Sequence, residues 1–389
     1  MPSVHPLHIA VSNEVIDDLR ERLARTRWPD EIVGSAWDYG TELAYLQDLV
    51  IYWRDEYDWR VHERGLNELA HFRAEVGGLA IHFVHERGRG PDPLPLVLTH
   101  GWPSSFLEML KILSLLTDPA AHGGDPDDSF DVVVPSLPGF GFSERPRVPG
   151  IASARTAELW ADLMTDVLGY SRFAAHGGDI GSGVTTRLGQ LFPERLAAIH
   201  LTTQVADAYV GAGAAPLTAA EREFLERLDA WEESEGGYSA IQRTKPQTLA
   251  FSLNDSPAGL AAWIVEKFRA WSDCGGDVES RFTRDELLTN LTLYWVTETA
   301  GSAARMYFEA RRHSRPLGLG DRVKVPTGVT LFPNEFAPET PPPREWVERS
   351  YDLRHYRTMP HGGHFPALEE PEALVDELRA FFRPFRHDR

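Results

Sequence analysis

The sequence is poor in cysteine, in positive charge and in long apolar runs. Cys274 is the single cysteine among 389 residues, which excludes an intrachain disulfide and predicts a reducing, cytoplasmic location. No stretch approaches the roughly 18 consecutive apolar residues of a membrane-spanning helix. The N-terminus, Met-Pro-Ser-Val-His-Pro-Leu-His, lacks the basic and apolar regions of a secretory signal, so no signal peptide is expected.

Acidic residues outnumber basic residues by 58 to 39, which gives a formal net charge of −19. Nucleic acids and anionic membrane surfaces attract basic patches, so this balance argues against both as partners and disfavours a strongly anionic substrate. The hydrophobic content of 42%, with 11 Trp, 11 Tyr and 19 Phe, is ample for a large packed core. We expect a soluble, acidic, globular protein. The sequence leaves open whether it is a monomer or a homo-oligomer.

The first 75 residues have helical patterns. Ser12 or Asn13 can cap a helix over residues 14–26, where apolar residues recur four apart. A second helical pattern covers residues 41–57 and is too apolar to stand alone. Residues 1–75 are therefore predicted to form a helical segment that wraps around the rest of the chain.

Strands alternate with helices from about residue 77 onward. The expected strands cover residues 79–86, 93–99, 131–135, 173–177 and 196–201, and the helices between them residues 105–116 and 156–168. Such alternation predicts an α/β fold with a mostly parallel sheet and helices on both faces. We assign residues 76–207 to the first part of this core.

The alternation stops over residues 208–315, where the sequence turns helical and begins acidic. Strands resume at 323–332 and 355–359, and a closing amphipathic helix covers 371–382, so residues 316–389 complete the core. A helical insertion over the carboxyl ends of parallel strands is the expected position of a lid, or cap.

The stretch Phe-Ala-Ala-His-Gly-Gly-Asp-Ile-Gly-Ser-Gly, residues 173–183, has the spacing of a sharp strand-to-helix turn. In hydrolases such a turn presents a nucleophile, usually Ser or Cys, and here it would present Asp179. The alternative is that Asp179 only caps the following helix. This pattern alone leaves both interpretations open.

A carboxylate nucleophile selects a class of electrophile. If a serine opened an epoxide or displaced a halide at an alkyl carbon, the product would be an ether that water does not readily release. A carboxylate gives an ester, and a His-activated water can hydrolyse its carbonyl. An aspartate at the turn therefore argues for alkyl-carbon electrophiles and against peptidase, lipase and esterase activity.

His364 and Glu335 stand where a catalytic base and its orienting acid would be expected. His364 lies in Pro360-His-Gly-Gly-His-Phe-Pro366, between the last strand and the last helix, and Glu335 follows the strand at 323–332. Asp207 competes with Glu335 for the acid role. His361 and His364 could also form a metal pair, but no third ligand is spaced to join them.

The turn after the strand at 93–99 can supply an oxyanion hole. Within His100-Gly-Trp-Pro103, the N–H of Trp102 would join the N–H of Ile180.

Two further patterns in the sequence do not predict a functional site. Gly139-Phe-Gly141 lacks the third glycine of a dinucleotide fingerprint, and His82 and His85 point to opposite faces of a strand.

Several short motifs occur in an order that resembles the microsomal-type (juvenile-hormone-type) epoxide hydrolases of the α/β-hydrolase fold. These motifs are His100-Gly-Trp-Pro103, Ser136-Leu-Pro-Gly-Phe-Gly-Phe-Ser143, Gly177-Gly-Asp-Ile-Gly-Ser182, Thr244-Lys-Pro, Leu253-Asn-Asp-Ser-Pro257, Glu266-Lys-Phe268, Phe332-Pro-Asn-Glu335 and Gly362-Gly-His-Phe365. The resemblance covers nearly the whole chain, including the N-terminal segment of that family. It implies an enzyme without cofactor or metal that converts a small-molecule epoxide and water to a vicinal diol.

The resemblance also implies a role for each catalytic position. Asp179 would be the nucleophile that forms a covalent ester, His364 the base and Glu335 the acid that orients it. Tyr238 and Tyr307 match the two cap tyrosines that donate hydrogen bonds to the epoxide oxygen in this family. Each tyrosine taken alone is as well explained as a core residue with a satisfied hydroxyl.

The sequence departs from the family pattern beside the nucleophile, where many relatives have Trp and this chain has Ile180. A haloalkane or haloacid dehalogenase also uses an aspartate at this turn, but it needs halide-binding donors such as that indole. A non-catalytic binding protein of the same fold is the third hypothesis. We expect a hydrophobic epoxide in a pocket formed by Trp102, Phe106, Ile180, Phe251 and Trp263.

Overall fold

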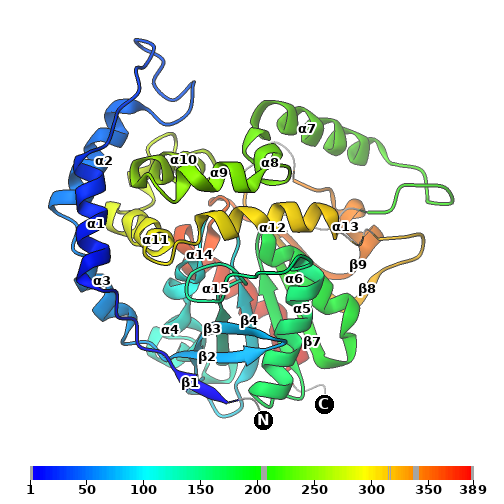
Figure 1. Ribbon diagram of the computed structural model, residues 1–389. Helices are drawn as coiled ribbons and strands as arrows, with labels where there is room; N and C mark the ends of the chain where they lie inside the picture. Colours follow the sequence, from blue (N-terminus) through cyan, green and yellow to red (C-terminus); the bar gives the residue numbers. More distant parts are fainter. Residues whose placement is uncertain (1–2, 203–207, 314, 316, 336–340, 387–389) are drawn as a thin grey trace.

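A nine-stranded mixed sheet forms the centre of the computed structural model (Figure 1). The structure describes residues 3–386 except 203–207, 314, 316 and 336–340. The strands lie in the order β1-β2-β3-β5-β4-β6-β7-β8-β9. Their bounds are Val4–Pro6, His71–Val76, Leu79–Glu86, Leu94–Thr99, Phe130–Pro135, Phe173–Gly177, Leu196–Thr202, Val323–Leu331 and Tyr351–Thr358, from β1 to β9.

The six strands from β5 to β9 in this order pair in parallel, and β1, β2 and β3 pair antiparallel at one edge. Every residue of β5, β6 and β7 is buried, as expected for strands covered on both faces. The fold is an α/β-hydrolase fold with a mostly parallel sheet, as the sequence predicts. Parallel strands end at the same edge, so the loops after β4, β6, β8 and β9 gather there.

Helices pack against both faces of the sheet. One contacting pair is α5 (Ser153–Asp162) and α6 (Ile180–Leu191), and the other is α4 (Leu110–Thr117) and α15 (Pro371–Phe382). In Figure 1 the first pair lies in front of the sheet and α15 behind it. The short helices α13 (Arg344–Ser350) and α14 (Pro366–Glu369) precede and follow β9.

The N-terminal segment, residues 1–75, is not wholly helical. It contains α1 (Asn13–Ala24), α2 (Leu43–Asp55) and α3 (Trp59–Leu66), with Ser12 capping α1 as expected, but also β1 and β2. Sequence reasoning missed β1 because three residues carry no alternation signal. It missed β2 because exposed and buried residues do not alternate regularly along this strand.

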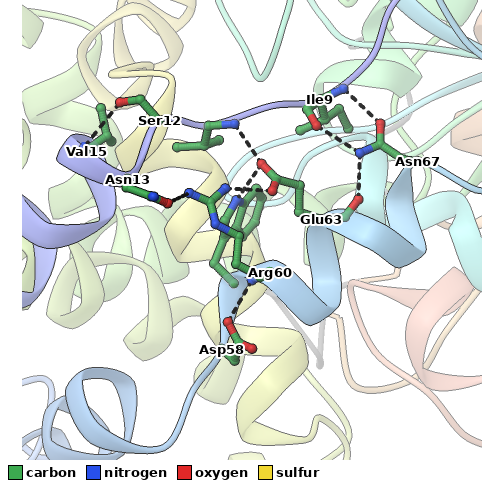
Figure 2. Close-up of polar contacts among 10 residues, drawn as sticks. Ile9, Ser12, Asn13, Val15, Asp58, Arg60, Glu63 and Asn67 are labelled. Atoms are coloured by element: carbon green, nitrogen blue, oxygen red, sulfur yellow. Dashed lines mark hydrogen bonds and ion pairs between the residues drawn. The ribbon is translucent and has the colours of Figure 1, made fainter.

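Polar side chains at α3 attach the start of the chain to this helix (Figure 2). Asn67 accepts a hydrogen bond from the N–H of Ile9 and donates one to its carbonyl, both at 2.8 Å. Glu63 accepts the N–H of Val11 at 2.7 Å and pairs with Arg60 at 2.6 Å. These contacts satisfy backbone groups that a strand edge does not pair, and they fix where α1 begins.

Six helices lie between β7 and β8, and we call residues 219–312 the helical insertion. They are α7 (Ala219–Glu235), α8 (Gly237–Gln242), α9 (Pro246–Leu253), α10 (Pro257–Ala270), α11 (Arg284–Val296) and α12 (Ala300–Arg312). Figure 1 shows them gathered at one end of the molecule, with α1 and α2 alongside. The indole of Trp53 in α2 donates to Thr292 in α11 at 2.9 Å. Within the described ranges, no helix is both long and apolar enough to span a bilayer.

Candidate active site

Asp179 occupies a strained turn between β6 and α6. Its backbone has φ 50° and ψ −124°, a conformation that non-glycine residues rarely adopt. Gly181 permits the turn, because a Cβ at this position would lie 2.0 Å from the carbonyl oxygen of Thr99. Within the described structure the Asp179 side chain makes no capping hydrogen bond to α6. The turn therefore presents the carboxylate to the edge of the sheet, and helix capping does not explain this residue.

Trp102 directs its backbone N–H at Asp179. This loop follows β4, and the N–H donates to Asp179 Oδ1 at 2.8 Å. Helix α11 holds the loop in place: Asn290 donates to the carbonyl of Pro103 at 2.9 Å and Tyr294 to that of Ser104 at 2.7 Å. The helical insertion thus positions a donor that the sequence assigns to the core.

The imidazole of His364 lies between two carboxylates. The loop after β9 places its Nε2 3.8 Å from Asp179 Oδ2, and its Nδ1 is hydrogen-bonded to Glu335. Glu335 follows β8, and a bridge between Asn334 and Gly363 joins the two loops. Asp207, the competing acid, lies outside the described residues. Nucleophile, base and acid candidates thus come from the ends of β6, β9 and β8.

The charges around His364 favour its protonated form. Burial is the largest influence and opposes protonation, but the carboxylates of Glu335, Asp179 and Glu108 together outweigh it and raise the pKa of His364 to about 9. In the resting site His364 is accordingly an imidazolium paired with two acids. A change in the charge of Glu335 or of Asp179 therefore shifts the pKa of His364.

Tyr238 in α8 and Tyr307 in α12 reach the same site from the helical insertion. The Trp102 ring is parallel to that of Tyr238, with centroids 5.2 Å apart, and edge-on to that of Tyr307 at 5.8 Å. Burial raises the pKa of both phenols, and the negative charge of Asp179 raises both further. Both tyrosines therefore keep their protons at working pH and can act as hydrogen-bond donors.

The predicted pocket residues divide into two groups. Trp102 and half-buried Ile180 flank Asp179, whereas Phe106 packs in the core against His82, with ring centroids 5.0 Å apart. Phe251 is 74% exposed, because α9 buries Ala250 and Leu253 on its opposite face. Trp263 is half-buried on α10. The placement of Phe106 and Phe251 in the pocket is therefore not supported.

Trp271 is a site residue that sequence reasoning missed. It ends α10, its carbonyl accepts the N–H of His364 at 2.7 Å, and its ring centroid lies 4.9 Å from that of His364. Its indole also contacts the rings of Tyr238 and Trp102. The signal that could have found it is its place three residues after Phe268, the last residue of a motif already singled out.

The patterns set aside on the sequence have structural roles. His82 bridges His71 and Ser136 at 2.9 and 2.8 Å, and His85 contacts the Tyr170 hydroxyl at 2.9 Å. Among the residues that the structure describes, no group of three or more His, Cys, Asp or Glu side chains is placed to hold a metal ion.

The chain matches two protein-family models. Residues 4–109 match the model described as "Epoxide hydrolase N terminus", and residues 95–233 match the model of the alpha/beta hydrolase fold. The first match covers the N-terminal segment together with the Trp102 loop, and the second includes Asp179. Together they span the region in which β1–β7 and the first part of the site are formed.

Named relatives are similar over almost the whole chain. A protein of Stigmatella aurantiaca (strain DW4/3-1), provisionally named an epoxide hydrolase, is 44% identical over 98% of this chain and 86% of its own length. Epoxide hydrolase 1 of Oryctolagus cuniculus is 37% identical over 97% of this chain and 88% of its own. The crystal structure of juvenile hormone epoxide hydrolase from the silkworm Bombyx mori superposes with a TM-score of 0.84 at 31% identity, covering 99% of this chain and 95% of that chain.

Proposed function

This chain belongs to the epoxide hydrolases of the α/β-hydrolase fold, and we propose that it converts a hydrophobic epoxide to a vicinal diol through an ester on Asp179. One arrangement carries this proposal. The Asp179 carboxylate accepts the Trp102 N–H through Oδ1 and faces His364 through Oδ2, within the electrostatic reach of Tyr238 and Tyr307.

The first step is alkylation of Asp179. Oδ1 accepts the Trp102 N–H, and we assign the attack on an epoxide carbon to Oδ2, the oxygen that faces His364. A bond forms from Oδ2 to that carbon while the carbon–oxygen bond of the ring breaks. Tyr238 and Tyr307 donate hydrogen bonds to the departing oxygen, and a proton transferred from them leaves it as a hydroxyl.

The second step is hydrolysis of the ester. His364 takes a proton from a water molecule, whose oxygen attacks Cγ of Asp179. The negative charge that develops on Oδ1 is stabilised by the N–H of Trp102, and we assign the second donor to the N–H of Ile180. The Cγ–Oδ2 bond then breaks and the diol oxygen takes the proton from His364, which leaves Asp179 as a carboxylic acid. This acid gives its proton to His364, so that the carboxylate and the imidazolium of the resting site are both restored.

The charges of the site couple the two steps. The carboxylate of Asp179 is one of the groups that raise the pKa of His364 to about 9. Esterification removes that charge, so once the ester exists the imidazolium releases its proton more readily, to the tyrosinate that the first step leaves. His364 thereby becomes a base in the intermediate that requires one.

We assign the helical insertion to a cap over the substrate. It supplies Tyr238, Tyr307 and Trp271, whereas the sheet edge supplies Asp179 and His364. The ring of Trp102, whose N–H binds the carboxylate, contacts three aromatic rings from the insertion, which favours an apolar, uncharged substrate. Ile180 replaces the indole donor expected of a dehalogenase, and this favours an epoxide over a haloalkane.

A single-turnover experiment in H₂¹⁸O tests the ester route. With enzyme in excess over styrene oxide, the first diol takes its new oxygen from Asp179 and so contains only ¹⁶O, and ¹⁸O enters the carboxylate. With substrate in excess, later diols contain ¹⁸O. If the first diol already carried ¹⁸O at the wild-type rate, water would attack the epoxide directly and the ester route would be wrong.

A further inference from the structure

The turn that carries His364 is held by a buried carboxylate outside the proposed triad. Glu369 ends α14, five residues after His364 in the chain, and is 8% exposed. We propose that Glu369 is a positioning residue that ties the His364 turn to the helical insertion, so that the imidazole stays aligned for ester hydrolysis. The inference rests on the proposed role of His364 as the base.

Glu369 joins two segments far apart in the sequence. Its Oε1 accepts the N–H of Phe365, the residue after His364, at 2.9 Å. Its Oε2 accepts the N–H of Asp273, which follows α10 in the helical insertion, at 2.8 Å. A carboxylate supplies two acceptors and no donor, and this matches two converging backbone N–H groups.

Asp273 returns the contact from the insertion side. Its Oδ2 accepts the N–H of Gly362 at 3.0 Å, and the carbonyl of Trp271 accepts the N–H of His364 at 2.7 Å. The fit is close at Gly363, where a Cβ would lie 2.6 Å from the Trp271 carbonyl oxygen and 2.7 Å from that of Asn334. Four hydrogen bonds thus fix residues 362–365 against the end of α10.

The charges around Glu369 suit this role. Arg281 pairs with Asp273 and with Glu370, each at 3.0 Å, so the exposed side of the network is neutralised. Burial raises the pKa of Glu369 to about 7, although the two backbone N–H groups and the cation of His364 oppose that rise. When Asp179 is alkylated its charge no longer attracts His364, whereas Glu335 and the backbone of this turn still hold the residue.

The two chemical steps depend on different loops, which makes the role of Glu369 measurable. Alkylation uses Asp179, the Trp102 loop and two tyrosines, whereas Glu369 binds the backbone of Phe365 and Asp273. Hydrolysis depends on His364. A displacement of this turn by a fraction of an ångström therefore affects the second step more than the first.

The test compares Glu369→Gln with Glu372→Gln, an exposed neighbour on α15 that loses the same charge. Rapid quenching of enzyme mixed with excess styrene oxide, followed by mass spectrometry of the intact protein, measures both rate constants. Glutamine has an NH₂ group, a donor, in place of one carboxylate oxygen, an acceptor. That NH₂ group would face a backbone N–H, and the hydrogen bond would be lost. We expect Glu369→Gln to slow hydrolysis about 10- to 100-fold, with alkylation within about twofold of wild type. Glu369→Asp, which keeps both acceptors, should recover part of the loss.

Gly363→Ala is a second route to the same result. Its methyl group displaces the turn without removing a charge, so it should also accumulate ester, even if Glu369→Gln does not fold. If both variants fold and keep the wild-type ratio of the two rate constants, Glu369 only stabilises the fold and the inference is wrong. The His364→Ala variant separates the proposed function from the inference about Glu369. If His364→Ala accumulates no ester, the proposed function is wrong. If His364→Ala accumulates ester and Glu369→Gln does not, only the inference is wrong.

Discussion

The indole of Trp102 lies parallel to the phenol of Tyr238, with ring centroids 5.2 Å apart and planes inclined by 6°. Trp102 belongs to the loop after β4, and Tyr238 to α8 of the helical insertion. The stack joins the donor proposed for the ester oxyanion to a donor proposed for the epoxide oxygen. Because these groups serve different steps, removal of the Tyr238 hydroxyl should affect the first step and leave the backbone donor of the second in place.

Tyr238→Phe and Tyr307→Phe should each slow alkylation of Asp179 by about 100-fold, the usual effect of removing one donor from a developing oxyanion. Hydrolysis of the ester should change little, because its charge develops on Oδ1 of Asp179. Quenched-flow mass spectrometry measures both rate constants. Tyr39→Phe is the control, since Tyr39 is 82% exposed. A larger effect on hydrolysis than on alkylation would remove the tyrosines from their proposed role.

Glu335→Gln should lower the pKa of His364 below its present value of about 9, because the Glu335 charge is the chief influence that favours the imidazolium against burial. Titration of the imidazole by NMR measures the shift. Ester hydrolysis should fall by about 10²- to 10⁴-fold, the usual contribution of general base catalysis. An unchanged pKa in the folded variant would show that Glu335 does not control this histidine.

The same raised pKa predicts a trend in stability. Because the pKa of His364 is about 9 when folded and 6.5 when exposed, its contribution is complete below about pH 6.5 and is lost as the pH rises through 9. Urea unfolding of wild type and Glu335→Gln at pH 6 to 9.5 measures it. The stability difference between the two proteins should shrink toward high pH, and a difference that grows would contradict the assigned sign.

His85 should make the opposite contribution at acid pH. Burial lowers the pKa of His85 to about 4, so its stabilising contribution is present above pH 6.5 and is lost as the pH falls through 4. His85→Gln, which can keep a hydrogen bond to Tyr170, should lose stability less steeply than wild type over this range, by up to about 1.4 kcal/mol per pH unit. Urea titrations at pH 4 to 7 test this, with exposed His122→Gln as the control. Parallel curves for His85→Gln and wild type would contradict it.

Ile180→Trp should alter selectivity more than rate. The proposed oxyanion donor is the backbone N–H of residue 180, which the substitution keeps, whereas the side chain flanks the nucleophile. Styrene oxide turnover should stay within about tenfold of wild type, and the ratio of attack at the two ring carbons should change. Fragment mass spectrometry of the diol formed over many turnovers in H₂¹⁸O locates the label on one carbon or the other and measures that ratio. An unchanged ratio would place the side chain outside the substrate pocket.

Local patterns in the sequence predicted the fold and the positions of the candidate groups at the sheet edge. Each of these positions follows a strand that is buried and continuous enough to recognise, and Asp179 sits in a turn whose glycines are dictated by close backbone contacts. The ordered motifs added the family. The sequence patterns predict the order of the candidate catalytic groups along the chain and the edge of the sheet at which these groups meet.

The lining of the pocket could not be predicted in the same way. Whether an aromatic residue of α9 or α10 faces the site depends on how these helices rotate against each other, and short helices have too few turns to show an apolar face. Phe251 consequently lies in solvent, whereas Trp271, at the end of α10, contacts His364. The Glu369 contacts were equally hidden, because one of them joins Glu369 to Asp273, 96 residues away, only after the insertion has packed.

Trapping of the covalent intermediate is the most direct test of Asp179 as the nucleophile. His364→Ala, mixed with styrene oxide and analysed by peptide mass spectrometry, should carry the mass of one substrate on the peptide that contains Asp179. Asp179→Ala/His364→Ala should carry none, and Asp179→Ala alone should be inactive. Absence of the adduct while wild type forms diol, its appearance on another residue, or wild-type turnover by Asp179→Ala would contradict the proposed mechanism.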